Sequence, residues 1–397
     1  MTSTDRPVDH DFTAIGPELD PYYQQLQRER PVARIRLRNG QLAWLVTRWE
    51  DARRVLADPL FSRALAAGRA AGPLRRETFI TDMDPPEHTR VRRHALTAFT
   101  HRRVQRMRPG IEQIVTRLLD EMEADGDPAD LVEYLSLPLP VTVICELLGV
   151  PAQDRDRFGS WSDAFLSVSA YTPEEVAAAH QRLDSYLAGL IAQRRAEPED
   201  DLLSALVHVR DDEGGLTEGE LVNLGVGLLI AGYETTATQL TNFTYTLLTH
   251  PGAWERLLAE PDLLPAAIEE LLRFVPLGSE TGMPRVATQD VLIGGVLIHA
   301  GEMVLAARPV ANRDESVFPH SQRLDLDRSD NPHLAFGYGI HHCLGAHLAR
   351  LELQTAIGAL LTRYPRLHLA VPTQELRWKE GLSVRGLVEL PIAWRES

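Results

Sequence analysis

Residues 333–350, HLAFGYGIHHCLGAHLAR, decide how the rest of the chain is interpreted. At their centre, Cys343 stands between a glycine-rich turn and a run with the apolar spacing of a helix start. A cysteine at such a junction has backbone N–H groups directed at its sulfur, and the positive end of the helix dipole favours the thiolate over the thiol. The stretch therefore predicts a metal ligand.

The residues around Cys343 favour one kind of metal group. The glycines permit a close turn and leave a flat space beside the sulfur, Phe336 can cover the sulfur, and His341 can donate to a nearby anion. A wide, flat, anionic metal complex, haem, fits this description. A buried free cysteine is one alternative. A zinc site using Cys343 and His347 is another, but its second half is missing, because the only other cysteine is the remote Cys145.

A second unusual stretch lies in the longest helical pattern, residues 217–249, which predicts a helix about 50 Å long. Its middle, GVGLLIAGYETTATQ, combines glycines and consecutive threonines, which are poor helix formers. Gly232 would let a flat group approach the backbone, and a hydroxyl at Thr235 or Thr236 can open the helix locally. With Glu234 this places an acid and an alcohol together. The pattern indicates a functional site, or a kink needed only for packing.

The pattern Phe336-x-x-Gly339-x-His341-x-Cys343-x-Gly345 resembles the haem-binding loop of bacterial soluble cytochrome P450s. This resemblance implies a mainly α fold with a small β region, and a single domain over residues 1–397. Haem b would lie between the long central helix and the helix after the cysteine loop. Cys343 would be the axial ligand of the iron, and Phe336, His341 and Gly345 would contact the cofactor. Thiolate ligation favours cleavage of the O–O bond of dioxygen.

Further motifs of the same family occur in the family's order between residues 84 and 350. The string AGYETT resembles the oxygen-activation motif, which implies that Thr235 delivers protons and that Glu234 is its partner. The string DPPEHTR implies that His88 and Arg92, which are i, i+4 on one helix face, hold a haem propionate. Arg285 matches a further propionate contact.

The resemblance also implies supporting and substrate-contacting residues. Glu270 and Arg273 are i, i+3 and would form a buried ion pair, joined by Arg323, that holds the shape of the haem loop. Residues 277–282 and 381–384 would line the substrate cavity. The predicted cavity residues are Ala231, Leu277, Gly278, Ser279, Leu382 and Ser383.

Local patterns predict several other elements. Alternating apolar residues around Asn39-Gly40 predict a hairpin over residues 32–46. Apolar periodicity predicts helices over residues 17–29, 49–58, 173–198 and 344–364. Residues 61–84 lack a sustained period, which is typical of a lid or a binding loop. Cys145 lies among apolar neighbours and is predicted to be buried and inert.

Composition excludes several classes of protein. The 397 residues are 44% hydrophobic, which is enough for a large core. Lys and Arg number 41 against 56 Asp and Glu, so the net charge of −15 argues against a nucleic-acid partner. Two distant cysteines make no disulfide framework, the stretch MTSTDRPVDHDF has neither the basic start nor the apolar core of a signal peptide, and no apolar run approaches the roughly 18 residues of a membrane span. We expect a soluble, cytoplasmic protein.

The expected function is haem-thiolate monooxygenation. No dinucleotide-binding fingerprint is present, so electrons from NAD(P)H would arrive through a separate ferredoxin and its reductase. A basic series could steer such an acidic partner; it comprises Arg90, Arg93, Arg102, Arg103, Arg106 and Arg108.

The overall pattern resembles actinobacterial enzymes that hydroxylate or epoxidise macrolides and related secondary metabolites. The alternatives are oxidative coupling of an aromatic or cyclodipeptide substrate, a haem peroxygenase, and a non-catalytic haem- or ligand-binding protein.

Overall fold

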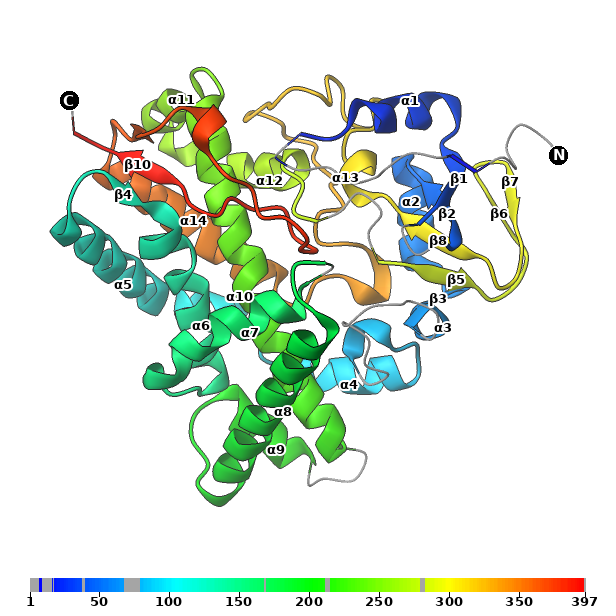
Figure 1. Cartoon of the computed structure of the whole chain (residues 1–397), viewed down its shortest axis with the longest axis horizontal. Helices are drawn as coiled ribbons and strands as arrows, with labels where there is room; N and C mark the ends of the chain where they lie inside the picture. The colour runs from blue at the N-terminus through cyan, green and yellow to red at the C-terminus, as the bar shows by residue number, and fades with distance from the viewer. Residues whose placement is uncertain are drawn as a thin grey trace. The chain divides into compact units, whose positions relative to one another are not determined.

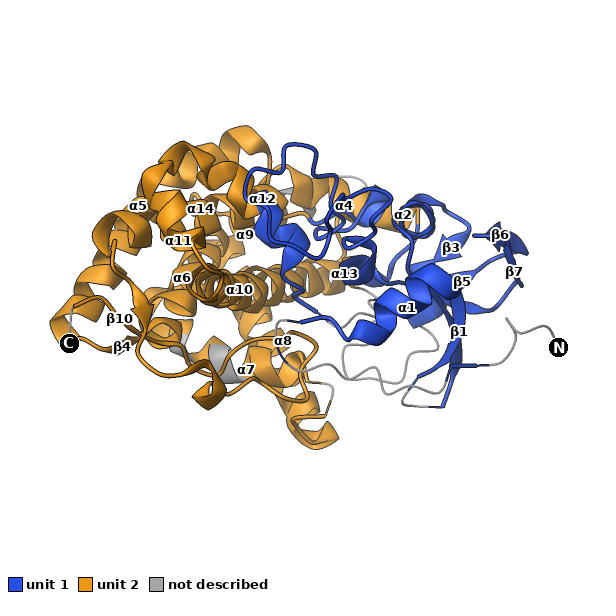
Figure 2. Cartoon of the chain, turned by 90° about the horizontal axis from the view of Figure 1, so that it is seen from above, with its two compact units in different colours: residues 1–77, 81–84, 269–343 blue, residues 78–80, 85–268, 344–397 orange. Residues whose placement is uncertain are grey.

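The computed structural model describes residues 7–8, 16, 18–37, 40–67, 79–167, 169–210, 215–278 and 283–395. The predicted cavity residue Ser279, the turn residue Asn39 and residues 68–78 of the predicted binding loop lie outside this part. The chain divides into two compact units, each built from segments that are far apart in the sequence (Figure 2). Unit 1 comprises residues 1–77, 81–84 and 269–343, and unit 2 comprises residues 78–80, 85–268 and 344–397.

Unit 1 contains a five-stranded sheet with the strand order β1-β2-β8-β5-β3 (Figure 1). Its strands are β1 (Val32–Arg36), β2 (Leu42–Val46), β3 (Phe61–Ser62), β5 (Arg285–Ala287) and β8 (Met303–Ala306). β1 and β2 pair antiparallel with Val32 opposite Val46, which confirms the predicted hairpin. β2 pairs parallel with β8, so the N-terminal hairpin and the later strands share one sheet.

The remaining elements of unit 1 are short. β6 (Val291–Ile293) and β7 (Val296–Ile298) form a separate ribbon. One apolar core packs the helix over residues 49–57 against the sheet, with Val55 and Val304 fully buried. The helices are α1 (Pro21–Glu29), α2 (Trp49–Ala57), α3 (Arg63–Ala67), α13 (Arg308–Ala311) and the C-terminal part of α12 (Leu264–Phe274).

Unit 2 is mainly helical (Figure 1). Its small sheet has the order β4-β10-β9, from β4 (Ala129–Asp130), β9 (His368–Leu369) and β10 (Pro391–Ala393). Its helices are α4 (Glu87–Leu96), α5 (His101–Asp125), α6 (Pro138–Leu148), α7 (Phe158–Phe165), α8 (Pro173–Ala196), α9 (Leu202–Arg210), α10 (Glu218–Thr249), α11 (Ala253–Ala259) and α14 (Ala346–Arg363). The two units together confirm a mainly α fold with a small β region. Among the described helices, none is both long and apolar enough to cross a membrane.

The long helix α10 begins and ends almost where the sequence predicts. Thr217 and Glu220 form a reciprocal capping box at its start, which satisfies two backbone N–H groups that the helix leaves unpaired. The helix is continuous, so the predicted local opening does not occur. The predicted flat approach at Gly232 is also wrong, because α6 fills that space: a Cβ on Gly232 would lie 2.8 Å from Cγ1 of Ile144.

Candidate active site

The conformation of the Cys343 loop is fixed by a backbone hydrogen bond and by two glycines. The Cys343 N–H donates to the Phe336 carbonyl at 2.9 Å, and Gly337 and Gly339 adopt left-handed conformations with φ of +75° and +74°. A Cβ on Gly339 would lie 2.8 Å from the backbone of α2, so only glycine fits there. These constraints leave the Cys343 thiol exposed, three residues before α14 begins. Cys145, by contrast, is fully buried, and burial raises the pKa of its thiol to about 12, as predicted for an inert cysteine.

A buried ionic network supports this loop from within unit 1. Arg273 and Glu270 form the expected ion pair, with both side chains fully buried and two hydrogen bonds of 2.6 and 2.7 Å. The third member is not Arg323 but Arg328, whose Nε lies 3.0 Å from Glu270 Oε2. Arg323 contributes only its backbone carbonyl, which accepts from Arg273 at 3.2 Å, so the predicted side-chain role of Arg323 is corrected.

The network reaches the loop through Asn312. Arg273 donates to the Asn312 carbonyl at 2.8 Å, and the Asn312 side-chain oxygen accepts the backbone N–H of Leu334 at 2.7 Å. The Leu334 carbonyl then accepts the N–H of Gly337 at 2.9 Å. The ionic network therefore positions the backbone at the start of the Cys343 loop.

Two buried arginines, Arg63 and Arg285, and the half-buried Arg308 give unit 1 a local excess of positive charge. Burial, and then the neighbouring Arg63 and Arg308, lower the pKa of Arg285 to about 9. Arg63 is already paired with Asp82 at 2.5 Å, whereas Arg308 donates to the neutral Ala335 carbonyl at 3.2 Å. An anion placed beside Arg285 and Arg308 would relieve this repulsion. The group therefore fits a negatively charged substituent such as a haem propionate.

The other predicted propionate residues lie on two further elements. His88 and Arg92 are one turn apart in α4, with His88 only 1% exposed and Arg92 half-buried. His341 lies in a short 3₁₀ turn, Gly339–His341, and is half-buried. Arg90, which the sequence placed in the basic series, is instead ion-paired with Glu220 of α10.

Two more observations agree with a flat cofactor. At Gly345, the N-cap of α14, no atom lies within 4 Å of the position a Cβ would take, so the backbone faces open space. Ala231 is exposed and Thr235 half-buried, although the helix around them is otherwise mostly buried.

The described residues contain no group of three or more His, Cys, Asp or Glu side chains placed to hold a metal ion, which leaves a zinc site without the additional ligands it needs. The residues present thus fit a haem held by Cys343.

On α10 the predicted acid and alcohol have different partners. Thr235 Oγ1 donates to the Ala231 carbonyl at 2.6 Å. The carboxylate of Glu234 is fully buried; its Oε1 accepts from Lys379 Nζ at 2.7 Å and from Thr238 at 3.3 Å. Burial raises the pKa of Glu234, and the charge of Lys379 opposes that shift. The two groups are neighbours in sequence, but the structure shows no direct hydrogen bond between them.

The predicted substrate-contacting residues lie at half-buried positions in both units. Leu277 and Gly278 follow α12 in unit 1, and Leu382 and Ser383 lie in the C-terminal segment of unit 2. Leu382 bridges to Ser167, which fixes the C-terminal segment against the end of α7. Their contact with a substrate remains a prediction.

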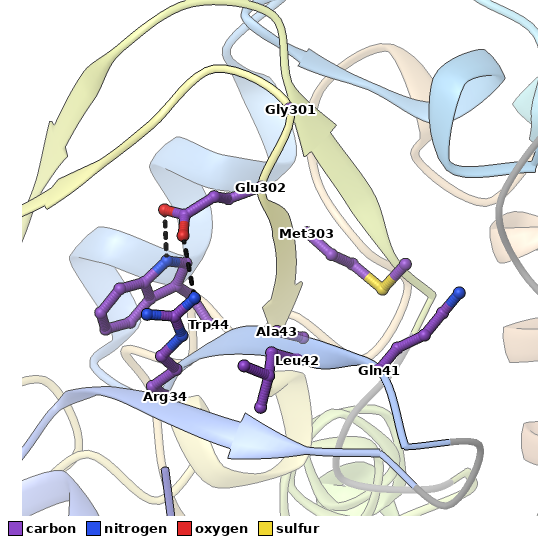
Figure 3. Close-up of a pocket in the computed structure, with 8 residues that line it drawn as sticks. All are labelled: Arg34, Gln41, Leu42, Ala43, Trp44, Gly301, Glu302 and Met303. Atoms are coloured by element: carbon purple, nitrogen blue, oxygen red, sulfur yellow. Dashed lines mark hydrogen bonds and ion pairs between the residues drawn. The ribbon is translucent and has the colours of Figure 1, made fainter. Parts of the chain in front are cut away.

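A pocket of about 280 Å³ at the edge of the unit 1 sheet is separate from these residues (Figure 3). Its polar walls are already paired, because Glu302 accepts from Trp44 Nε1 at 2.8 Å and from Arg34 at 3.3 Å. It contains none of the predicted site residues. The candidate site residues are therefore those of the Cys343 loop in unit 1 and those of α4 and α10 in unit 2.

Unit 1 thus has an exposed thiol ahead of a helix and a local excess of positive charge, and unit 2 has a long helix with a central acid and threonine. These are the features expected of a haem-thiolate protein, and comparison with known proteins supports that class. Residues 13–380 match the family described as Cytochrome P450. The chain belongs to this family, whose members are haem-dependent monooxygenases.

Similar proteins cover the chain from end to end. The chain is 49% identical to mycinamicin IV hydroxylase/epoxidase of Micromonospora griseorubida over 99% of its length and 100% of the relative's. It is also 49% identical to nocardicin C N-oxygenase of Nocardia uniformis subsp. tsuyamanensis, with the same coverage. The crystal structure of cytochrome P450mel with biaryl coupling reactivity matches with a TM-score of 0.92 and 43% identity, over 96% of this chain and 98% of that one. The fold and the class of enzyme predicted from the sequence are confirmed.

Sequence reasoning missed three residues of the candidate site. Arg328 was overlooked in favour of Arg323, and nothing in the local pattern distinguishes the two. Arg308 was not predicted, although a charged residue two positions after a buried strand is a usable signal. Lys379 was not singled out, yet it is the only lysine in the sequence.

Proposed function

We propose that this monooxygenase hydroxylates or epoxidises a macrolide or a related polyketide. The observation that carries the proposal is the 49% identity to mycinamicin IV hydroxylase/epoxidase over the whole length of both chains. The same identity to nocardicin C N-oxygenase shows that relatives this similar differ in substrate. The monooxygenase chemistry thus rests on the family, and the substrate class rests on this one relative.

The site residues have distinct roles in this proposal. Haem b, when bound, supplies the activation of dioxygen and the oxidation of the substrate. Cys343 would be its thiolate ligand, and Phe336 and Gly345 would contact the ring. His88, Arg92, Arg285, His341 and the additional cation Arg308 would hold the propionates, since a buried unpaired carboxylate would be costly. Thr235 Oγ1 delivers the protons that dioxygen cleavage consumes, and Glu234 reloads it.

We further propose that residues 1–397 act as a single functional domain, to which unit 1 contributes Cys343 and unit 2 contributes Thr235. The electron donor is a separate ferredoxin with its NAD(P)H-dependent reductase, which suits a cytoplasmic location. The exposed Arg93, Arg102 and Arg106 would attract its acidic surface.

Replacing Thr235 by alanine should uncouple electron consumption from product formation. Without the hydroxyl, the fraction of NADH electrons recovered in product should fall about tenfold or more, with the difference appearing as hydrogen peroxide. Thr235→Ser should retain most of the coupling. Thr241→Ala is the matched control, because Thr241 also donates to the carbonyl four residues earlier, at 3.1 Å, but is buried. Equal coupling in the Thr235 and Thr241 alanine variants would remove Thr235 from the mechanism.

A binding screen tests the substrate class. Macrolides, aromatic polyketides and cyclodipeptides would be titrated into the ferric enzyme, and the shift of the haem absorption band recorded. We expect macrolides to bind at least about tenfold more tightly than the other two classes, a difference of about 1.4 kcal/mol. Preference for a cyclodipeptide would overturn the substrate proposal and leave the monooxygenase assignment intact.

Oxidative coupling is a second candidate, because the structurally similar cytochrome P450mel has biaryl coupling reactivity. The two reactions differ in their products. Mass spectrometry after turnover under ¹⁸O₂ would show one labelled oxygen in a hydroxylated or epoxidised product, and a dimer or ring-closed product without label after coupling. A product without label would favour the second candidate.

A further inference from the structure

Two separate segments of unit 2 meet at the carboxylate of Glu234, and a third, α7, packs against α10. Glu234 lies in the middle of α10, and Lys379, whose Nζ is 2.7 Å from Glu234 Oε1, comes from the C-terminal segment. That segment turns back on itself: the Lys379 N–H donates to the Gly386 carbonyl at 2.7 Å, and Trp378 bridges to Leu387. Lys379 is thereby held by its own backbone as well as by its ion pair.

The C-terminal segment is in turn fastened to the end of α7. The Ser169 N–H donates to the Gly381 carbonyl at 2.9 Å, and the Ser383 N–H donates to the Leu166 carbonyl at 3.0 Å. A Cβ on Gly381, whose φ is +69°, would lie 2.7 Å from the Ala170 nitrogen, so glycine is needed for this approach. The contact holds Lys379 near α7, which carries the half-buried Asp163.

The group contains two carboxyls for one cation. Burial raises the pKa of Asp163, and Lys379 opposes that shift. The negative charge of Asp163 also adds to the raised pKa of Glu234, whose largest cause is burial. Burial lowers the pKa of Lys379, but Glu234 and Asp163 together raise it further, so Lys379 stays charged. The other titratable groups facing the cluster, Tyr171 and Tyr233, have raised pKa values and stay neutral near pH 7.

One oxygen of Glu234 is available for a proton. Both donors of the site, Lys379 and Thr238, bind Oε1, while Oε2 is buried and has no hydrogen-bond partner among the described residues. A buried carboxylate oxygen without a donor is costly unless it is protonated or hydrated. The geometry of the cluster is therefore suited to a carboxyl that alternates between the protonated and ionised forms.

We propose that Asp163, Lys379 and Glu234 share one proton, with Asp163 as the outer group that reloads Glu234 from solvent. One proton leaves the Asp163 carboxyl and one arrives at Glu234, and Asp163 regains its proton from water. Lys379 is a positioning residue. Its positive charge stabilises whichever of the two carboxyl groups, Asp163 or Glu234, is ionised. The inference rests on the proposed role of Glu234 and Thr235 in proton delivery, and it adds a solvent-side group on α7.

The chain offers a direct spectroscopic test, because Lys379 is its only lysine. Lysine labelled with ¹³C and ¹⁵N in the side chain gives a single side-chain signal in the diamagnetic ferrous–carbon monoxide holoenzyme. As the pH rises, that signal should show an inflection when the shared proton is lost. Asp163→Asn removes one negative charge near Glu234, which lowers the pKa of Glu234, so the inflection should move to lower pH. An unchanged inflection in Asp163→Asn would overturn the proposal.

Turnover supplies an independent measurement. Asp163→Asn and Lys379→Met should each lower the fraction of electrons recovered in product by about threefold or more, and Lys379→Arg should restore it. Arg377→Met is the matched control, because Arg377 lies on the same segment but is exposed and paired with the half-buried Glu389. Equal coupling in Lys379→Met and Arg377→Met would overturn the proposal. If Lys379→Met does not fold, the titration of Asp163→Asn still decides.

Failure of this inference and failure of the proposed function are distinguishable. The lysine titration requires no substrate and no turnover, so it reports only on the cluster. The substrate screen and the Thr235→Ala variant report on the monooxygenase itself. A normal Thr235→Ala effect with an unchanged lysine titration would leave the proposed function standing and remove only the role of Asp163.

Discussion

Cys343→Ser is expected to bring product formation below detection. A serine hydroxyl stays neutral at working pH, so the variant lacks the anionic ligand that favours O–O cleavage. The change is nearly isosteric, and the backbone hydrogen bond from residue 343 to the Phe336 carbonyl should persist. Product formed per enzyme would be measured with NADH, ferredoxin and reductase in excess.

The control for this variant is the chain's other cysteine. Cys145 is fully buried in α6, and Cys145→Ala should lower the free energy of unfolding by about 1 kcal/mol while turnover is retained. Turnover by Cys343→Ser at the level of Cys145→Ala would contradict the assignment of the thiolate ligand.

Arg273→Leu is expected to lower the free energy of unfolding by about 3–5 kcal/mol, because it removes the main cationic partner of the fully buried Glu270. It also removes the hydrogen bond to the Asn312 carbonyl, through which the network reaches the Cys343 loop. We therefore expect the purified variant to carry less haem per chain. The measurements are denaturant unfolding and the ratio of haem to protein absorbance.

Arg117→Leu is a matched control, because it removes an arginine from an exposed pair with Glu121 on α5. Exposed ion pairs on a helix contribute only about 0.3–0.5 kcal/mol, so the free energy of unfolding of this variant should be close to that of the unmodified protein. If the Arg273 and Arg117 variants were equally stable, the ionic network would not support the loop.

The features that the sequence predicts correctly are local ones. The hairpin depends on a turn dipeptide between alternating residues, and the starts of α8 and α10 depend on threonine caps with a glutamate three residues later. The Cys343 loop is likewise defined by glycines within ten residues, two of which take positive φ values. In each case the deciding interactions join residues that are near in sequence.

The features that the sequence does not predict are choices between distant partners. Arg323 and Arg328 are five residues apart and chemically identical, and only the path of the chain decides which side chain reaches Glu270. Gly232 was expected to face a flat ligand. The structure shows instead that Ile144 of α6 packs so closely that only glycine fits at this position. Lys379 is 145 residues from Glu234, so no periodicity could connect them.

The difference spectrum of the reduced protein under carbon monoxide tests the central claim most directly. Thiolate ligation by Cys343 predicts the red-shifted Soret band that is characteristic of this family, and Cys343→Ser should lose that band while Cys145→Ala keeps it. A wild-type spectrum without the red-shifted band, or its persistence in Cys343→Ser, would contradict the account.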